Sequence, residues 1–258
     1  MAFLEEKPNQ LNPIIRWGIF IIAAVAGKFA VSAAFAAYHK SDTYLGSQFD
    51  EMENRPPAAM LFQALKKDYP EEYGSLRSKI ISVASQGGSN SDVKSAAHDE
   101  VRALITRHKG GIASAPEPVL GRLRQVQLKL IGQLSSESAT ACAQYVMGGL
   151  PASTQLSSAG YAVLSDLGVA QVEAAHAGEL KPVTRPKEIS SADAQALGSA
   201  MREAGATQAQ IETLASPNGM ATIGADQQCE IGSLLSRALA TLPDEQADRL
   251  FSAFFAAS

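Results

Sequence analysis

The sequence contains few residues whose type and spacing could carry out chemistry. Its four histidines are His39, His98, His108 and His176, and none stands at the HExxH, HxH or Cys/His spacing of a zinc site. On one helix, His98 and His108 would lie about 80° apart around the axis, so they cannot readily share an ion. A nucleophile elbow, a P-loop and a dinucleotide-binding glycine motif are also missing. The sequence therefore predicts no metal, no cofactor and no catalytic residue.

Two adjacent pairs of carboxylates are the remaining candidates for acid–base chemistry. Glu71 and Glu72 fall in the first turn of a predicted helix, where the helix dipole favours negative charge. Asp99 and Glu100 stand beside Arg102 and are expected on a solvated helix face. A hydrolase site could still combine an acid and a base from distant positions, because glycosidase carboxylates are not neighbours in sequence. A membrane-tethered envelope hydrolase is therefore an alternative function.

The only cysteines, Cys142 and Cys229, each lie near the start of a predicted helix. An even, sparse count downstream of an export segment is compatible with one structural disulfide in an oxidising compartment. The bridge would close a loop of 87 residues, for which the chain-entropy model gives roughly 4 to 5 kcal/mol of stabilisation. The alternative is two unrelated buried thiols that pack as small hydrophobic side chains. We expect the disulfide, and with it a domain outside the cytoplasm.

Residues 17–38 form 22 residues of nearly unbroken apolar sequence, from Trp17 to Tyr38. At about 1.5 Å per residue, such a helix crosses the roughly 30 Å hydrocarbon core of a bilayer. We therefore predict an N-terminal tail over 1–16 and a transmembrane helix over 17–38. A signal peptide cleaved near Ala36 is the alternative, but Lys28 and about eight further apolar residues would separate its apolar core from the cleavage point.

Lys28 lies near the middle of this span, where a charged side chain costs roughly 2.5 to 3.5 kcal/mol on insertion scales. One explanation is that the long side chain carries its ammonium to the membrane surface. The other is a partner helix, because helical spacing gathers small or polar residues on the same face. The face comprises Ala24, Lys28, Ser32 and Phe35, with His39 one turn beyond. It is the predicted site of contact with a second membrane subunit.

The rest of the chain shows helical periodicity. Apolar residues recur at helical spacing from residue 57 onward, no stretch alternates at period two, and only 6% of residues are aromatic. Ser190 or Ser191 and Thr207 are predicted N-caps, and the glycine pairs at 87–88, 110–111 and 148–149 are predicted to end helices. We predict an all-α fold in which the transmembrane helix precedes a bundle or orthogonal array of about nine short helices.

Breaks in the pattern divide this part of the chain. Residues 39–56 are polar and end at Pro56 and Pro57, which indicates a juxtamembrane linker. Residues 149–155 are the clearest internal break, so 57–150 and 151–258 are predicted to form two helical subdomains. Residues 41–150 carry 12 Lys or Arg and 12 Asp or Glu, whereas 151–258 carry 6 and 12. The acidic distal half disfavours nucleic acid or anionic lipid as its partner.

The apolar C-terminus is the best candidate for contact with a partner outside the membrane. Leu250, Phe251, Phe254 and Phe255 stand at helical spacing, so the simplest interpretation is a last helix docked on the core. In the alternative, Phe251, Phe254 and Phe255 form a hydrophobic anchor for a partner or the membrane surface.

Together these features predict a function in assembly rather than catalysis. We expect a single-pass protein of a bacterial inner membrane with its C-terminal domain in the periplasm. That domain would act as a protein-interaction or accessory subunit of a membrane complex, with the lipid bilayer and other membrane subunits as its partners. The alternatives are the tethered hydrolase and a secreted ligand-binding helical module released by signal cleavage.

Overall fold

A computed structural model describes residues 42–257, with side chains over 44–255. In this range the chain forms eleven α-helices and one 3-10 helix, and no strand. The predicted all-α class is therefore confirmed for the described residues. The predicted transmembrane helix and its face of Ala24, Lys28, Ser32 and Phe35 lie outside them. None of the described helices is long and apolar enough to cross a membrane.

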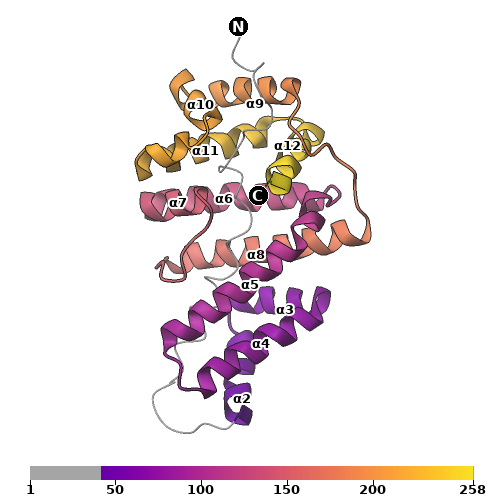
Figure 1. The fold of residues 1–258 in the computed structure, drawn as a ribbon, viewed down its shortest axis with the longest axis vertical. Coiled ribbons are helices and arrows are strands. Elements are labelled where there is room, and N and C mark those ends of the chain that lie inside the picture. Colours follow the sequence, from indigo (N-terminus) through magenta and orange to yellow (C-terminus); the bar gives the residue numbers. More distant parts are fainter. Residues whose placement is uncertain (1–41, 258) are drawn as a thin grey trace.

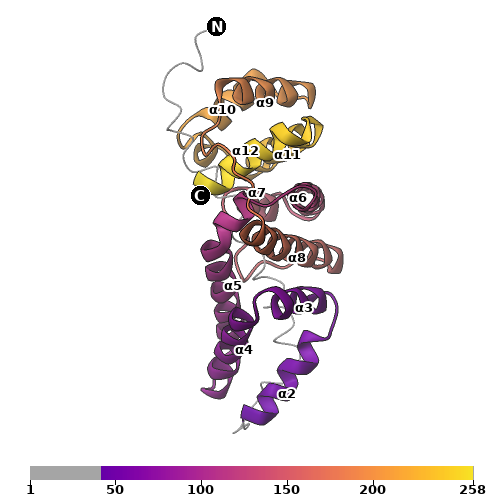
Figure 2. The same ribbon diagram turned by 90° about the vertical axis from the view of Figure 1, so that its right-hand side faces the viewer.

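The helices are stacked in layers along the long axis of the domain (Figures 1 and 2). Helices α9 and α10 lie at one end, followed by α11 with α12, then α6 with α7, and then α8. Helices α3, α4 and α2 complete the other end, and α5 runs along the stack. The bounds are α2 (Asp42–Glu53), α3 (Ala58–Asp68), α4 (Pro70–Ser85), α5 (Asn90–Ala113), α6 (Val119–Glu137), α7 (Ala139–Val146), α8 (Ser158–Leu180), α9 (Ser191–Glu203), α10 (Gln208–Ala215), η3 (Gly219–Thr222), α11 (Ala225–Thr241) and α12 (Asp244–Ala257).

Helix α2 is a departure from the linker predicted over 39–56. Leu45, Phe49 and Met52 follow helical spacing and are buried, and α2 packs on α3 and α4. The Phe49 ring meets Phe62 and Tyr73 edge-on, with ring centroids 5.5 Å and 6.3 Å apart. A stripe of three apolar side chains in an otherwise polar segment was too sparse to indicate a helix, but tertiary packing stabilises it.

Hydroxyl caps define where several helices begin. Ser190 and Thr207 accept hydrogen bonds from the backbone N–H groups of Asp193 and Gln210, which confirms the predicted caps of α9 and α10. The cap of α5 is Ser89, and Asp92 completes a capping box with it.

Helix α8 is the central helix of the domain. Fourteen of its 23 residues are buried, and it packs against α3, α5 and α6. A helix with so much of its circumference covered must be apolar nearly all round. The predicted break at 149–155 is the loop that precedes α8, and helices from both sides of this loop share one hydrophobic core.

Two glycines allow α5 and α8 to cross with their backbones in contact. A Cβ atom on Gly178 would lie 1.9 Å from the carbonyl oxygen of Gly111, and one on Gly111 would lie 2.4 Å from that of Ala175. The Gly110–Gly111 pair was predicted to end the helix, yet α5 continues to Ala113. In a sequence, a glycine can indicate either the end of a helix or a close approach between two helices. Here it indicates a close approach.

The crossing of α5 and α8 predicts that the effect of a glycine-to-alanine substitution on stability depends on its position. We expect Gly178→Ala to lower the free energy of unfolding by about 1–3 kcal/mol or more, because the added methyl would meet backbone atoms that cannot rotate away. Gly132→Ala in α6 is the matched control, since a Cβ there meets nothing within 4 Å and alanine should stabilise the helix by about 0.5–1 kcal/mol. Thermal unfolding followed by circular dichroism measures both. Equal effects of the two substitutions would contradict the backbone contact.

Candidate functional site

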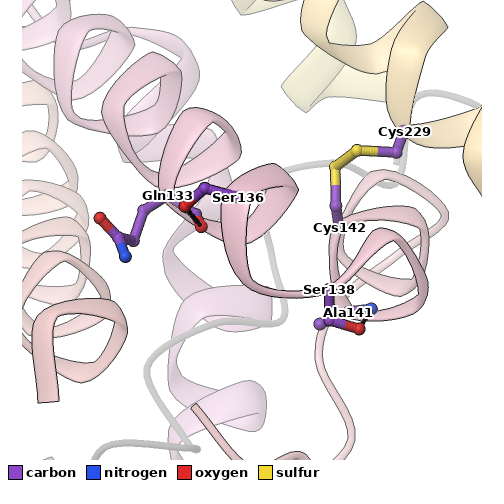
Figure 3. The surroundings of a disulfide bond; sticks show 6 residues. All are labelled: Gln133, Ser136, Ser138, Ala141, Cys142 and Cys229. Atoms are coloured by element: carbon purple, nitrogen blue, oxygen red, sulfur yellow. Dashed lines mark hydrogen bonds between the residues drawn. A yellow bond between two sulfur atoms is a disulfide. The ribbon is translucent and has the colours of Figure 1, made fainter. Parts of the chain in front are cut away.

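Cys142 of α7 and Cys229 of α11 form a disulfide, as predicted, with their Cα atoms 5.3 Å apart. Figure 3 shows the bond between the two helices, close to the connection from α6 to α7. Ser138 ends α6 and also caps α7 by accepting a hydrogen bond from the N–H of Ala141, at 3.2 Å. Both cysteines are buried, so the bridge is a structural element of the core.

The disulfide lies beside a second close contact between α7 and α11. A Cβ atom on Gly232 would be 2.3 Å from a methyl carbon of Val146, so these helices approach more closely than ordinary side chains allow. Helix α11 also packs on α6. Bridge and glycine together hold α11 in a fixed position against α6 and α7, where it forms one wall of a groove described below.

Helix α12 is held by a buried carboxylate, Asp248, of which only 2% is exposed. Its Oδ2 accepts a hydrogen bond from Arg185 at 3.0 Å, and its Oδ1 lies 3.1 Å from Nε of Arg124. Arg124 also donates to Glu117 and Asp244, at 2.9 Å and 3.1 Å. One charge cluster thus joins three parts of the chain, namely helix α6, helix α12 and the segment that follows α8.

Arg185 extends this cluster to the end of α5. Its second guanidinium nitrogen donates to the carbonyl oxygen of Ala115 at 2.8 Å, so it binds a free backbone acceptor as well as a carboxylate. Burial raises the pKa of Asp248 to about 6, and nearby Glu117 contributes to the shift, whereas Arg124 and Arg185 oppose it. A carboxylate ionised at neutral pH in this position depends on both guanidinium groups, because an unpaired buried charge is strongly destabilising.

A second buried carboxylate, Asp193 of α9, binds the opposite side of α12. Arg249 donates to both of its oxygens, at 2.8 Å and 3.2 Å, and Gln246 donates at 3.0 Å. Hydrogen bonding from Arg249 is the largest cause that lowers the pKa of Asp193 to about 2. Two ion-pair systems therefore orient α12 relative to α6 and α9.

These contacts leave a groove between α6, α11 and α12, with a volume of about 90 Å³. Its apolar lining comes mainly from Leu239 and Ala240 of α11 and from the three phenylalanines of α12. Its polar lining includes Gln125, Gln127, Ser236, Arg124 and Asp244. The side chain of Asp244 is 82% exposed although it accepts a hydrogen bond from Arg124, so the rim of the groove carries an accessible carboxylate. Such a combination of apolar floor and charged rim suits the binding of one protruding side chain.

The groove brings together Phe251, Phe254 and Phe255, the predicted partner anchor. Phe251 and Phe255 are buried, with ring centroids 5.0 Å apart, and they join the last helix to the core. Phe254 is only partly buried. The simple docking of the last helix therefore accounts for two of the three rings, whereas a role in binding a partner stays a prediction that rests on Phe254.

Of the histidines and carboxylates that were candidates for chemistry, some lie apart in the structure and others are in contact. His98 lies 3.2 Å from the carbonyl oxygen of Leu150, away from His108. His108 instead contacts Glu72 and Glu179, which come from α4 and α8. Sequence reasoning placed Glu72 in a first turn but did not connect it with a histidine, because the contacts join residues 36 and 71 positions apart. Within the described part of the chain, no group of three or more His, Cys, Asp or Glu is arranged to hold a metal ion.

No family model, curated protein or solved structure matches this chain.

Because of the disulfide, we expect the electrophoretic mobility and the stability of the chain to depend on whether its cysteines are oxidised. On non-reducing electrophoresis we expect the wild type to migrate faster than Cys142→Ser, because the bridge closes a loop of 87 residues in the denatured chain. The same loop gives an expected loss of roughly 4 to 5 kcal/mol of unfolding free energy in the variant by the chain-entropy model. Equal mobility of the two chains, with equal urea midpoints, would be incompatible with the bridge.

Asp193 predicts a loss of stability in acid. Because its pKa is lowered to about 2 in the folded chain and is about 3.9 in an unfolded one, its contribution is complete above pH 4 and is lost as the pH falls toward 2. We expect Asp193→Asn to reduce stability at neutral pH by about 1.5–3 kcal/mol, the range for hydrogen bonds to charged groups. The difference in unfolding free energy between Asp193→Asn and the wild type should shrink near pH 2.

Urea unfolding at neutral pH and near pH 2 measures this difference. Glu203→Gln, at the exposed end of α9, is the control and should follow the wild type at both values. A deficit of Asp193→Asn that is the same in acid as at neutral pH would refute the ionic role of Asp193.

Proposed function

We propose that this chain is a single-pass membrane protein whose helical domain, outside the cytoplasm, binds a partner subunit of a membrane complex in the groove between α6, α11 and α12. The observation that carries the proposal is the composition of that groove. Phe254 is partly exposed beside an apolar floor, and Asp244 supplies an accessible carboxylate at the rim.

The location of the domain is supported by two features. Residues 17–38 have the length and apolarity of a membrane span. The two cysteines of the described domain are paired and buried, which is typical of proteins that fold in an oxidising compartment. A domain that follows a span and contains a structural disulfide fits the periplasmic side of a bacterial inner membrane.

The partner segment that suits the groove is a basic amphipathic helix. An apolar side chain would occupy the floor beside Phe254, and a lysine or arginine one turn away would meet Asp244. The neighbouring Glu245 is 91% exposed and increases the negative potential at the start of α12. Residues 151–258 carry twice as many acidic as basic residues, so the wider surface also favours a basic partner over an acidic one.

The size of the groove suggests a contact with one central side chain. A volume of about 90 Å³ is smaller than the roughly 150 Å³ of a cavity that binds benzene, so the groove holds the tip of a single side chain. Interfaces commonly obtain most of their affinity from a few such anchors, surrounded by contacts that exclude water. Phe254 is the expected anchor contact on this chain.

Site-specific photocrosslinking in the native host tests the proposal. A photoreactive residue at Gln125, which is exposed and lines the groove, should form an adduct with a membrane protein. The same residue at Ser78 of α4 is the positional control. We expect Phe254→Ala to lower the adduct yield at Gln125 about tenfold or more, since truncating an aromatic anchor commonly costs 2 kcal/mol or more.

Two double variants test the role of the negative charge at the rim of the groove. Asp244→Asn combined with Glu245→Gln should reduce the yield severalfold at low salt, whereas Glu203→Gln combined with Glu230→Gln, at exposed sites outside the groove, should not. Peptide sequencing of the adduct should identify a basic amphipathic segment. Equal yields at Gln125 and Ser78, or adducts only between copies of this chain, would reject the proposal.

A further inference from the structure

A cluster of titratable side chains lies where α4 and α8 meet α5, away from the groove. His108 of α5 stands between two carboxylates, with Nδ1 2.6 Å from Oε1 of Glu179 and Nε2 3.2 Å from Oε1 of Glu72. Tyr69, between α3 and α4, completes the group, which we call the His108 junction. It joins α8 to α4 and α5, from which α8 is separated in the sequence by α6 and α7.

The backbone crossing of α5 and α8 creates this junction. Gly111 lies less than one turn after His108, and Gly178 directly precedes Glu179. Because these glycines bring the two backbones into contact, the side chains of His108 and Glu179 emerge next to each other. Helix α4 packs along α5 and presents Glu72 from its first turn to the other ring nitrogen.

Tyr69 holds Glu179 in place from the other side. Its hydroxyl donates to Oε2 of Glu179 at 3.0 Å, and its ring centroid is 4.3 Å from that of His108. Burial, followed by the hydrogen bond to Glu179, raises the pKa of Tyr69, so the phenol stays a donor at every physiological pH. Glu179 therefore keeps one hydrogen bond whatever the state of His108.

The two protonation states of His108 have different bonding capacity. An imidazolium has two N–H donors and satisfies both carboxylates, whereas a neutral ring has one donor and leaves a nitrogen lone pair facing a carboxylate. The contact with Glu179 is the shorter one and is supported by Tyr69, so the neutral ring loses its bond to Glu72. The side chain of His108 is 16% exposed, which gives water access for the proton.

We propose that His108 is a proton-dependent clamp between α4 and α8: the imidazolium binds Glu72 and Glu179 together, and its deprotonation releases Glu72 and loosens the corner between α3 and α4. The proton passes to solvent. Helices α2 to α4 are the part of the domain that directly follows residues 17–38, so the clamp would control how firmly the membrane-proximal helices are joined to α5 and α8. This proposal does not rest on the docking function of the groove.

Other charged groups lie near the junction. His176 of α8 is near the Tyr69 ring, at 5.8 Å between centroids, and its Nε2 lies 3.9 Å from Asp68 of α3. Lys67 lies 3.4 Å from the same carboxylate. On α12, which also packs on α5, the buried carboxylate is Asp248, and it is bound by Arg124 and Arg185. Of these groups, only His108 bridges two helices through both ring nitrogens.

Hydrogen exchange of the full chain in detergent micelles or nanodiscs tests the clamp. Protection factors, corrected for the intrinsic exchange rate, are compared at about pH 5.5 and about pH 8. We expect peptides over 66–76 to lose about tenfold in protection at the higher pH, the factor for one charge-assisted hydrogen bond. Peptides from α11 serve as the internal reference and should not change.

Variants assign the effect to the junction. His108→Gln should show the lower protection at both pH values, and Glu72→Gln should also remove the pH response. His98→Gln is the matched control on the same helix and should respond as the wild type does. A wild type that changes less than twofold, or a response that persists in His108→Gln and disappears in His176→Gln, would overturn the clamp. If α11 shows that His108→Gln is unfolded, Glu72→Gln decides: a retained response overturns the proposal, and its loss supports it.

Discussion

The fold depends on the contact between the backbones of α5 and α8 at Gly111 and Gly178. A methyl group at either position would overlap with carbonyl oxygens of the other helix, so no other residue type permits this approach. The contact lets α8 occupy the centre of the domain, where α3, α5 and α6 cover most of its circumference. Because interiors are close-packed, the position of α8 in turn determines where each covering helix can lie.

The layers above α8 need additional constraints, since α11 and α12 are short amphipathic helices at the end of the chain. The disulfide and the Gly232 contact hold α11 on α7. Buried carboxylates do the same for α12, through Asp248 toward α6 and the end of α5, and through Asp193 toward α9. Ion pairs of this kind add little to net stability, but they specify one orientation, because any other would leave a buried charge unpaired.

The two sites that we propose are consequences of this frame. The groove lies between helices that the disulfide and the ion pairs hold in place, and it is lined by the Arg124–Asp244 pair as well as by the phenylalanines of α12. The His108 junction exists because the glycine crossing sets His108 beside Glu179. In our proposals, the groove binds a segment of a partner, and the protonation state of His108 determines whether α4 is joined to α8 through Glu72.

The sequence by itself determined the local structure: the helical class, most helix positions, the hydroxyl caps at Ser190 and Thr207, and the pairing of the only two cysteines. These follow from short-range periodicity and from residue counts, which need no knowledge of neighbours in space. It did not reveal α2, because three buried side chains in a polar segment form a helix only when α3 and α4 cover them. It misplaced the end of α5, because a glycine pair is equally suited to a cap and to a close crossing. The groove and the His108 junction were decided by the tertiary structure alone, since each combines residues that are far apart in the chain and meet only in the folded domain.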